Sequence, residues 1–226
     1  MKLLLPLILL LFTTKIAAQN IFISTQPGTI LLYQETDANG KTIGYTRYTV
    51  TSVTGSGNNM TVFYLLENMD ANRQVTLEFP GRTYIRDGKI ILDIEQMIAP
   101  HLQNSGLGLE AEFSGTFMEM PADFSPGQRF ADTAGTIRIG RGILGMRVRM
   151  SVTDAKCVAI EDVTVPAGTF SAHKVTQTIS HTMLLRTNSV RLVSWYVHNI
   201  GTVKNRTYDE RGRLQSMSKL VEMVVP

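Results

Sequence analysis

The segment Gly140-Arg141-Gly142-Ile143-Leu144-Gly145 has the G-x-G-x-x-G spacing of a dinucleotide-binding loop. In such loops the glycines let the backbone approach a pyrophosphate, which the N-terminus of the following helix then holds. Here the next residues, 146–152, alternate between apolar and polar side chains, which is the period of a β-strand. We therefore predict a glycine-rich hairpin loop and no nucleotide or other cofactor.

The histidines are the next candidates for chemistry, and they are scattered: His101, His173, His181 and His198. On one straight strand His173 and His181 would share a face but stand about 26 Å apart, at ~3.3 Å per residue. The spacings H-x-E, H-E-x-x-H and C-x-x-C, which are typical of zinc sites, are absent from the sequence. We expect no metal site.

Cys157 is the only cysteine, so the chain cannot form a disulfide within itself. The apolar residues Val158, Ala159 and Ile160 follow it, and this setting favours a buried, unreactive thiol. A nucleophilic thiol, or a disulfide between two copies, is the alternative.

Two pairs of neighbouring carboxylates, Glu110 with Glu112 and Glu161 with Asp162, are residues of the kind that a glycosidase requires. Acids on strands more often face solvent, and this is the interpretation we favour. The nucleophile elbow G-x-S-x-G is absent, but a catalytic triad can assemble across a fold. We expect a protein that is not an enzyme, with a hydrolase of scattered residues as the weakest alternative.

Four arginines flank the glycine-rich segment, with no acid between Asp132 and Asp154: Arg138, Arg141, Arg147 and Arg149. Strand alternation places Arg138, Arg147 and Arg149 on one face of a hairpin, and Met150 with its apolar neighbours on the other. Such a stripe could bind lipid phosphates or anionic glycans. Alternatively, it is a solvated sheet face paired with acids of a neighbouring strand.

Methionine is abundant, since 10 of the 11 methionines follow the initiator. Methionine fills irregular apolar space, and it also suits a deformable pocket for varied apolar ligands. Core filling is the default interpretation, and a pocket lined by methionine is the alternative.

The elements that must position these residues are strands, because period-2 alternation dominates the chain. Three stretches have glycine at the fourth position of a turn, as type I turns favour: Asp37 to Gly40, Val165 to Gly168 and Asp209 to Gly212. Pro166 fixes φ for its turn, and Gly168 permits the positive φ from which the next strand folds back. We assign a turn role to Gly201 as well, and a tight hairpin to Asp87-Gly88.

One segment has the pattern of a helix, Asp93 to Ala99. Asp93 can cap it, Gln96 completes a capping box, and Pro100 ends it. Since no stretch has the composition of a linker, we predict one all-β domain over residues 19–226. It should contain about ten to thirteen antiparallel strands and one short helix near 93–100.

The first 18 residues have the pattern of a secretory signal peptide. Lys2 precedes an apolar run from Leu3 to Phe12, which is too short to cross a ~30 Å hydrocarbon core as a helix. We expect cleavage after Ala18 and no lipid anchor, because Gln19 stands where a lipoprotein has cysteine. No later stretch is long and apolar enough to span a membrane. We expect export to the periplasm, with secretion or the cell surface as the alternative.

Cleavage would also change the charge of the chain. Removing residues 1–18 takes away Lys2 and Lys15 and no acid, so the formal net charge falls from +3 to +1. This near balance gives no general attraction for nucleic acid, which we exclude as a partner.

A series of motifs runs through the C-terminal half: Pro126-Gly127-Gln128, Val165-Pro166-Ala167-Gly168-Thr169-Phe170, Trp195-Tyr196-Val197 followed by Gly201, and Asp209-x-x-Gly212. Together with Pro27-Gly28-Thr29 and the Asp37–Gly40 turn, this series resembles the TapB-like exported proteins of Gram-negative bacteria. The resemblance implies an antiparallel sheet curved into an open barrel or clam. It implies no catalytic residue.

Three functions follow as alternatives. We favour a binding module of the cell envelope for an apolar or amphiphilic ligand such as a lipid. Trp195, Tyr196 and methionines, Met150 among them, would form its ligand-binding residues, with the arginine stripe at its rim. This alternative predicts an apolar cavity of several hundred Å³. The second is a structural protein that docks an envelope partner through its sheet, which predicts a filled interior and an exposed apolar patch. The third is the hydrolase.

Overall fold

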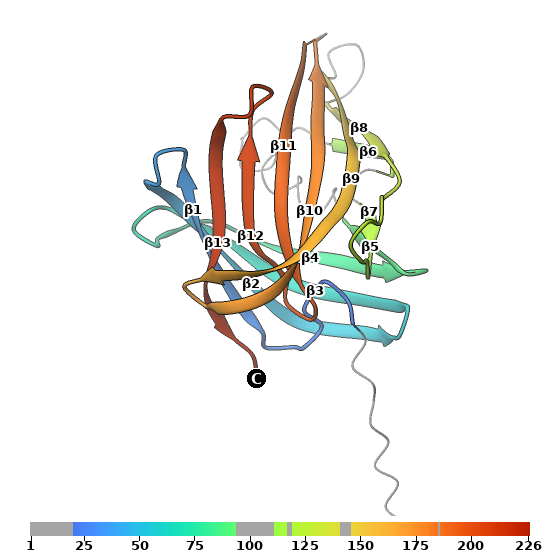
Figure 1. Ribbon diagram of the computed structural model, residues 1–226. Coiled ribbons are helices and arrows are strands. Elements are labelled where there is room, and N and C mark those ends of the chain that lie inside the picture. The colour runs from blue at the N-terminus through green and yellow to red at the C-terminus, as the bar shows by residue number, and fades with distance from the viewer. Residues whose placement is uncertain (1–19, 94–110, 117–118, 141–145, 185) are drawn as a thin grey trace, which may run out of the picture.

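Thirteen antiparallel strands form one continuous sheet in the computed structural model (Figure 1). The structure describes residues 20–93, 111–116, 119–140, 146–184 and 186–226. The strands are β1 (Ile30–Asp37), β2 (Thr42–Ser56), β3 (Asn59–Met69), β4 (Val75–Arg86), β5 (Lys89–Leu92), β6 (Ala111–Gly115), β7 (Glu119–Pro121), β8 (Thr133–Ile139), β9 (Met146–Val165), β10 (Gly168–Met183), β11 (Arg186–Val197), β12 (Gly201–Tyr208) and β13 (Leu214–Val224).

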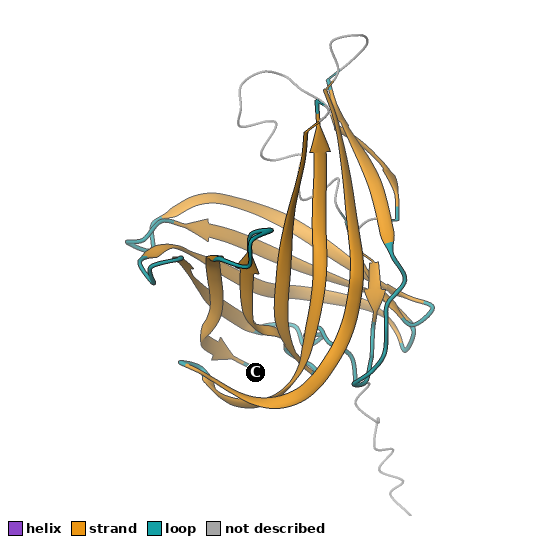
Figure 2. Ribbon diagram, turned by 45° about the horizontal axis from the view of Figure 1, so that its top comes forward, coloured by secondary structure: helices purple, strands orange, loops and turns teal. Residues whose placement is uncertain are grey.

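The sheet consists of two meanders joined at its centre. Its order is β6-β8-β9-β10-β11-β12-β13-β1-β2-β3-β4-β5-β7, so the first and last strands of the chain are neighbours. The sheet is open, with β6 and β7 at its edges, and β9–β11 run steeply across the direction of β2–β4 (Figure 2). The predicted all-β, antiparallel, open and curved architecture is confirmed.

Alternation of side chains decides which face each strand buries. In β4 the residues Phe79, Gly81, Thr83 and Ile85 are buried, and those between them are not. The segment after the glycine-rich loop is strand β9, as its period predicted, and no helix follows the glycines.

The predicted turns are confirmed where the structure describes them. Gly168 has φ 144° and pairs with Val165 across a two-residue loop, so this Pro-Ala-Gly stretch is a corner of the β9–β10 hairpin. A residue with a Cβ would be strained at this φ. The other assigned turn glycines also have positive φ: 82° at Gly40, 104° at Gly201 and 78° at Gly212. Asp87 and Gly88 (φ 49° and 72°) form the predicted tight turn.

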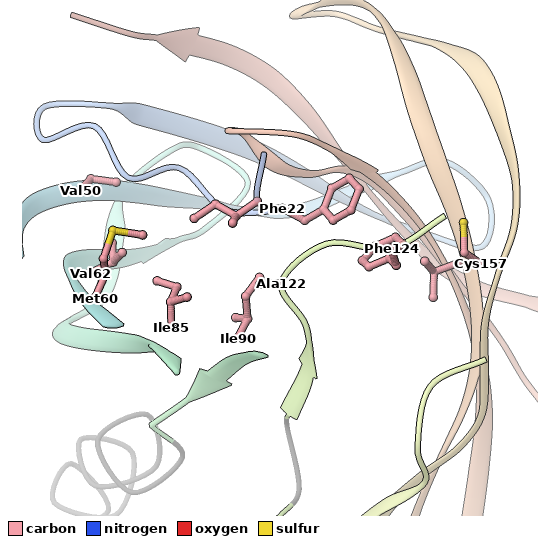
Figure 3. Close-up of a cluster of buried hydrophobic side chains, with 11 residues drawn as sticks. Phe22, Val50, Met60, Val62, Ile85, Ile90, Ala122, Phe124 and Cys157 are labelled. Carbon is pink, nitrogen blue, oxygen red and sulfur yellow. The ribbon is translucent and has the colours of Figure 1, made fainter. Parts of the chain in front are cut away.

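Among the described residues, two large hydrophobic clusters occupy the interior, and a smaller one surrounds Ile137. The first joins both meanders, because it gathers residues of β2–β5, β9 and β10 around the segment before β1 (Figure 3). In that segment Phe22 is 3% exposed and stacks on Phe124 with ring centroids 4.0 Å apart. The second cluster lies on β1 and β9–β13 and includes Trp195.

Three predicted features lie outside the described residues. These are the signal peptide within residues 1–19, the helix beyond Asp93, and the glycine-rich loop beyond Gly140. Among the residues that are described, no helix has the length and apolar character needed to cross a membrane.

Candidate functional site

A cavity of about 360 Å³ opens on the face of the sheet that carries Tyr33, Tyr48 and Tyr64. Strands β1–β5 supply about half of its lining. The rest comes from β7, the end of β11, β12, β13, the segment before β1 and the turn before β12. The apolar and aromatic lining consists of Phe22, Ile23, Leu31, Tyr33, Tyr48, Tyr64, Leu66, Ile90, Leu92, Met120, Tyr196 and Ile200. The other lining residues are Glu35, Thr46, Thr83, Gly201, Thr202, Asn205 and Ser218.

Two tyrosine rings in the lining of this cavity pack against each other. The rings of Tyr48 and Tyr64 lie 4.6 Å apart at 33°. Gly81 stands directly opposite Tyr64 on β4, and a Cβ at Gly81 would run into the Tyr64 ring. Glycine at position 81 therefore lets this ring lie flat along the sheet.

The tyrosines of the cavity remain neutral phenols at physiological pH. Burial raises the pKa of Tyr33, and it also raises the pKa of Tyr48, to which Tyr64 and Tyr33 add a smaller effect. Within the described part of the chain, the buried hydroxyl of Tyr48 has no hydrogen-bond partner. Because an unsatisfied buried hydroxyl costs free energy, a hydrogen bond to a polar atom of a ligand would be favourable there.

One end of the cavity is polar. The Thr46 hydroxyl donates to Glu35 Oε1 at 2.9 Å. Ser218 lies opposite Glu35 on β13, and Asn205 lies opposite Ser218 on β12. The site thus offers an apolar body and an end rich in hydrogen-bond acceptors, which suits an amphiphile whose polar group donates hydrogen bonds.

Of the two aromatic residues predicted as lining, only Tyr196 reaches the cavity. Trp195 packs in the second cluster, because neighbouring residues of an extended strand point to opposite faces. Among the methionines of the described residues, Met120 is the one that lines the cavity.

The predicted arginine stripe exists but lies elsewhere. Arg138 pairs with Arg147 across β8 and β9, and Arg149, two residues along, shares their face. All three are exposed, while Met150 packs against Ile137 on the other face, as alternation predicted. None of these residues lines the cavity, so its rim does not contain the stripe. Glu112 stands opposite Arg138 on β6, as the solvated-face alternative expects.

Sequence reasoning missed Phe22 and the tyrosines of β1–β3. The available signal was the spacing of Tyr33, Tyr48 and Tyr64 within alternating strands, since a tyrosine on the apolar face of a strand must find space for its hydroxyl. Phe22 gave no such signal, because it precedes the first strand.

The remaining candidates for chemistry have these surroundings. Cys157 is buried as predicted, at 1% exposure, and burial raises the pKa of its thiol. His198 contacts Asp123 Oδ1 at 2.9 Å, His181 contacts Asn188, and His173 packs edge-on against Phe22. Within the described ranges no group of three or more potential ligands could hold a metal ion. The absence of enzymatic activity stays a prediction.

Known proteins match this chain in fold. A crystal structure from Bacteroides fragilis, described as an exported protein with a YmcC-like fold, has a TM-score of 0.68 and 23% identity, and covers 91% of this chain and 99% of its own. A second, from Parabacteroides distasonis, is described as a lipoprotein and has a TM-score of 0.71, 21% identity and the same coverage. No curated protein matches the sequence.

The sequence resembles the TapB-like exported proteins. The structural matches support the broader part of this resemblance, which is an all-β fold shared with proteins described as exported or as a lipoprotein. A model of the DUF3108-like family matches residues 26–220, which is most of the chain. The protein therefore belongs to the DUF3108-like family.

Proposed function

We propose that this protein is an exported, non-catalytic binding protein that holds a small amphiphilic ligand in the tyrosine-lined cavity. The observation that carries the proposal is the cavity itself, about 360 Å³ and mostly apolar in its lining. Its volume lies at the small end of the usual range for ligand sites, ~300–1,000 Å³. It therefore suits a single acyl chain or ring system, rather than a whole phospholipid.

Two features support export and a place in the cell envelope, with the periplasm as the compartment. The first 18 residues have the pattern of a signal peptide. Proteins of the same fold are described as exported or as a lipoprotein. Docking of an envelope protein through the sheet remains the alternative function.

The decisive test is occupancy of the cavity. Leu66 lines it, whereas Leu65, the preceding residue on β3, points to the other face. A fluorescent apolar dye should bind the native protein and be displaced by fatty alcohols. Leu66→Trp should fill the cavity and reduce dye binding at least tenfold, while the matched control Leu65→Trp should bind normally.

Native mass spectrometry of the protein purified from the periplasm gives an independent readout. We expect an additional mass, of the size of a single-chain or single-ring amphiphile, that Leu66→Trp removes. A bare mass, together with dye binding that is equal in both variants, would refute the proposal. Capture of a partner protein by the same sample would favour the docking alternative.

A further inference from the structure

The reverse face of the sheet carries a cationic cluster around a buried tryptophan. Trp195 is 5% exposed, and its Nε1 donates to Glu161 Oε1 at 2.7 Å. Three cations lie over its ring: Lys174 Nζ at 5.3 Å, Lys204 Nζ at 5.1 Å and Arg206 Cζ at 5.8 Å from the centroid. Each of these cations is attracted to the face of the indole, but the three positive charges repel one another.

The strand register places these charges side by side. Lys174 lies opposite Trp195, Trp195 opposite Lys204, and Lys204 opposite Lys219. Gln34 of β1 follows Lys219 in the same row and is uncharged. Like charges directly opposite one another destabilise a sheet, so this arrangement is costly unless an anion is bound.

The carboxylate that neutralises part of this charge is Glu161, which accepts hydrogen bonds from Lys174 Nζ at 3.2 and 3.3 Å. The four cations Lys174, Lys204, Arg206 and Lys219 thus face one acid. Further along the same face, Lys156 and Arg191 line a pocket of about 360 Å³ together with Asp154, and add two cations and one acid. The excess of positive charge therefore extends beyond the cluster.

Two further observations indicate that the cluster could donate hydrogen bonds to a negatively charged ligand. Among the described residues, the buried Nε of Arg206 has no hydrogen-bond partner. Burial lowers the pKa of Lys204, and the charge of Arg206 lowers it further. Both effects would be relieved by an oxyanion that accepts hydrogen bonds from these groups.

We propose that Lys174, Lys204, Arg206 and Lys219, arranged around Trp195, bind a phosphate group, either as a free phosphate or as the headgroup of an anionic lipid. A guanidinium and ammonium groups that converge from neighbouring strands are suited to the oxygens of a phosphate. The site lies on the face opposite the tyrosine-lined cavity, so it does not depend on the proposed function.

Trp195 is the only tryptophan of the chain, so its fluorescence reports on this site directly. Inorganic phosphate, titrated against chloride at constant ionic strength, should change the emission in a saturable way. Vesicles of phosphatidylglycerol, compared with phosphatidylcholine, provide the second arm. A saturable response to phosphate would identify the ligand as a free phosphate. A response to the anionic vesicles alone would identify it as a lipid headgroup.

The test variant is Lys204→Gln with Arg206→Gln, which keeps Trp195 and Glu161 in place. The matched control is Arg138→Gln with Arg147→Gln, which removes two cations from the exposed stripe. We expect the first variant to weaken binding at least tenfold, and the control to change it less than twofold. Thermal unfolding checks that both variants fold, and Lys219→Gln replaces the first variant if it does not. Equal responses to phosphate and chloride together with equal responses to the two kinds of vesicle, or equal binding by variant and control, would overturn the proposal.

Discussion

Phe22 should be one of the most sensitive positions for stability, because its ring joins the two meanders. It stacks on Phe124 and on His198, with centroids 4.0 and 4.1 Å away, and it packs edge-on against Tyr196 at 6.0 Å. Its backbone N–H donates to the Ala122 carbonyl at 3.0 Å. The change to test is Phe22→Ala.

The magnitude follows from burial. Truncation of a buried phenylalanine costs about 3–5 kcal/mol, and each lost aromatic pair accounts for about 0.5–1.5 kcal/mol of such a loss. The segment precedes the first strand, so it can detach in the variant and regain about 1–2 kcal/mol of backbone entropy per released residue. This release limits the loss, and we expect Phe22→Ala to lower the free energy of unfolding by about 3 kcal/mol.

Urea denaturation, followed by far-ultraviolet circular dichroism, measures this difference. Ile43→Ala is the control, since Ile43 is 52% exposed on β2 and should change stability by less than about 1 kcal/mol. A loss below 1 kcal/mol for Phe22→Ala would mean that the segment merely lies on the surface, and that the meanders are held together by the sheet alone.

Three other predictions follow from single contacts. Gly81→Val should destabilise the fold by about 1–3 kcal/mol in the same assay, because its side chain would displace the Tyr64 ring. An unchanged midpoint would contradict the close packing of this ring against Gly81. Burial, and then a neighbouring histidine, lowers the pKa of His173 below 6.5, so the unfolded chain binds the proton more readily. Stability should therefore fall as the pH drops through 6.5, and His173→Phe should weaken this dependence whereas the exposed-site control His181→Phe should not. The buried Cys157 thiol should react with a disulfide reagent only after denaturation, and fast labelling of the native protein would show that it is accessible.

The local features of the fold could be predicted from the sequence because their causes are local. Asp87 and Gly88 form a tight turn since both adopt positive φ, and Gly168 turns the β9–β10 hairpin for the same reason. The two faces of the Arg147–Met150 stretch follow from alternation alone. In each case neighbouring residues are sufficient to determine the conformation.

The cavity could not be predicted in this way, because its walls meet through long-range pairing. Tyr33 on β1 lies opposite Leu220 on β13, and no local pattern specifies that the ends of the chain pair. The order of strands likewise decides that the arginine stripe lies near the β6 edge, on strands that do not line the cavity. The prediction that Trp195 and Tyr196 line the same cavity could have been avoided from the sequence, because adjacent residues of a strand point to opposite faces of the sheet.

The separation of Trp195 from Tyr196 shows how one sheet can present two different surfaces. On β12 and β13 the residues Asn205 and Ser218 face the cavity beside Glu35, while the adjacent Lys204 and Lys219 face the tryptophan. An anionic headgroup would meet the Glu35 carboxylate in the cavity but an excess of positive charge on the reverse face. If both proposed sites exist, the cavity should prefer a fatty alcohol or amine to the fatty acid of equal length, and Glu35→Gln should remove most of this preference. An unaltered preference in that variant would show that the polar end does not select the headgroup.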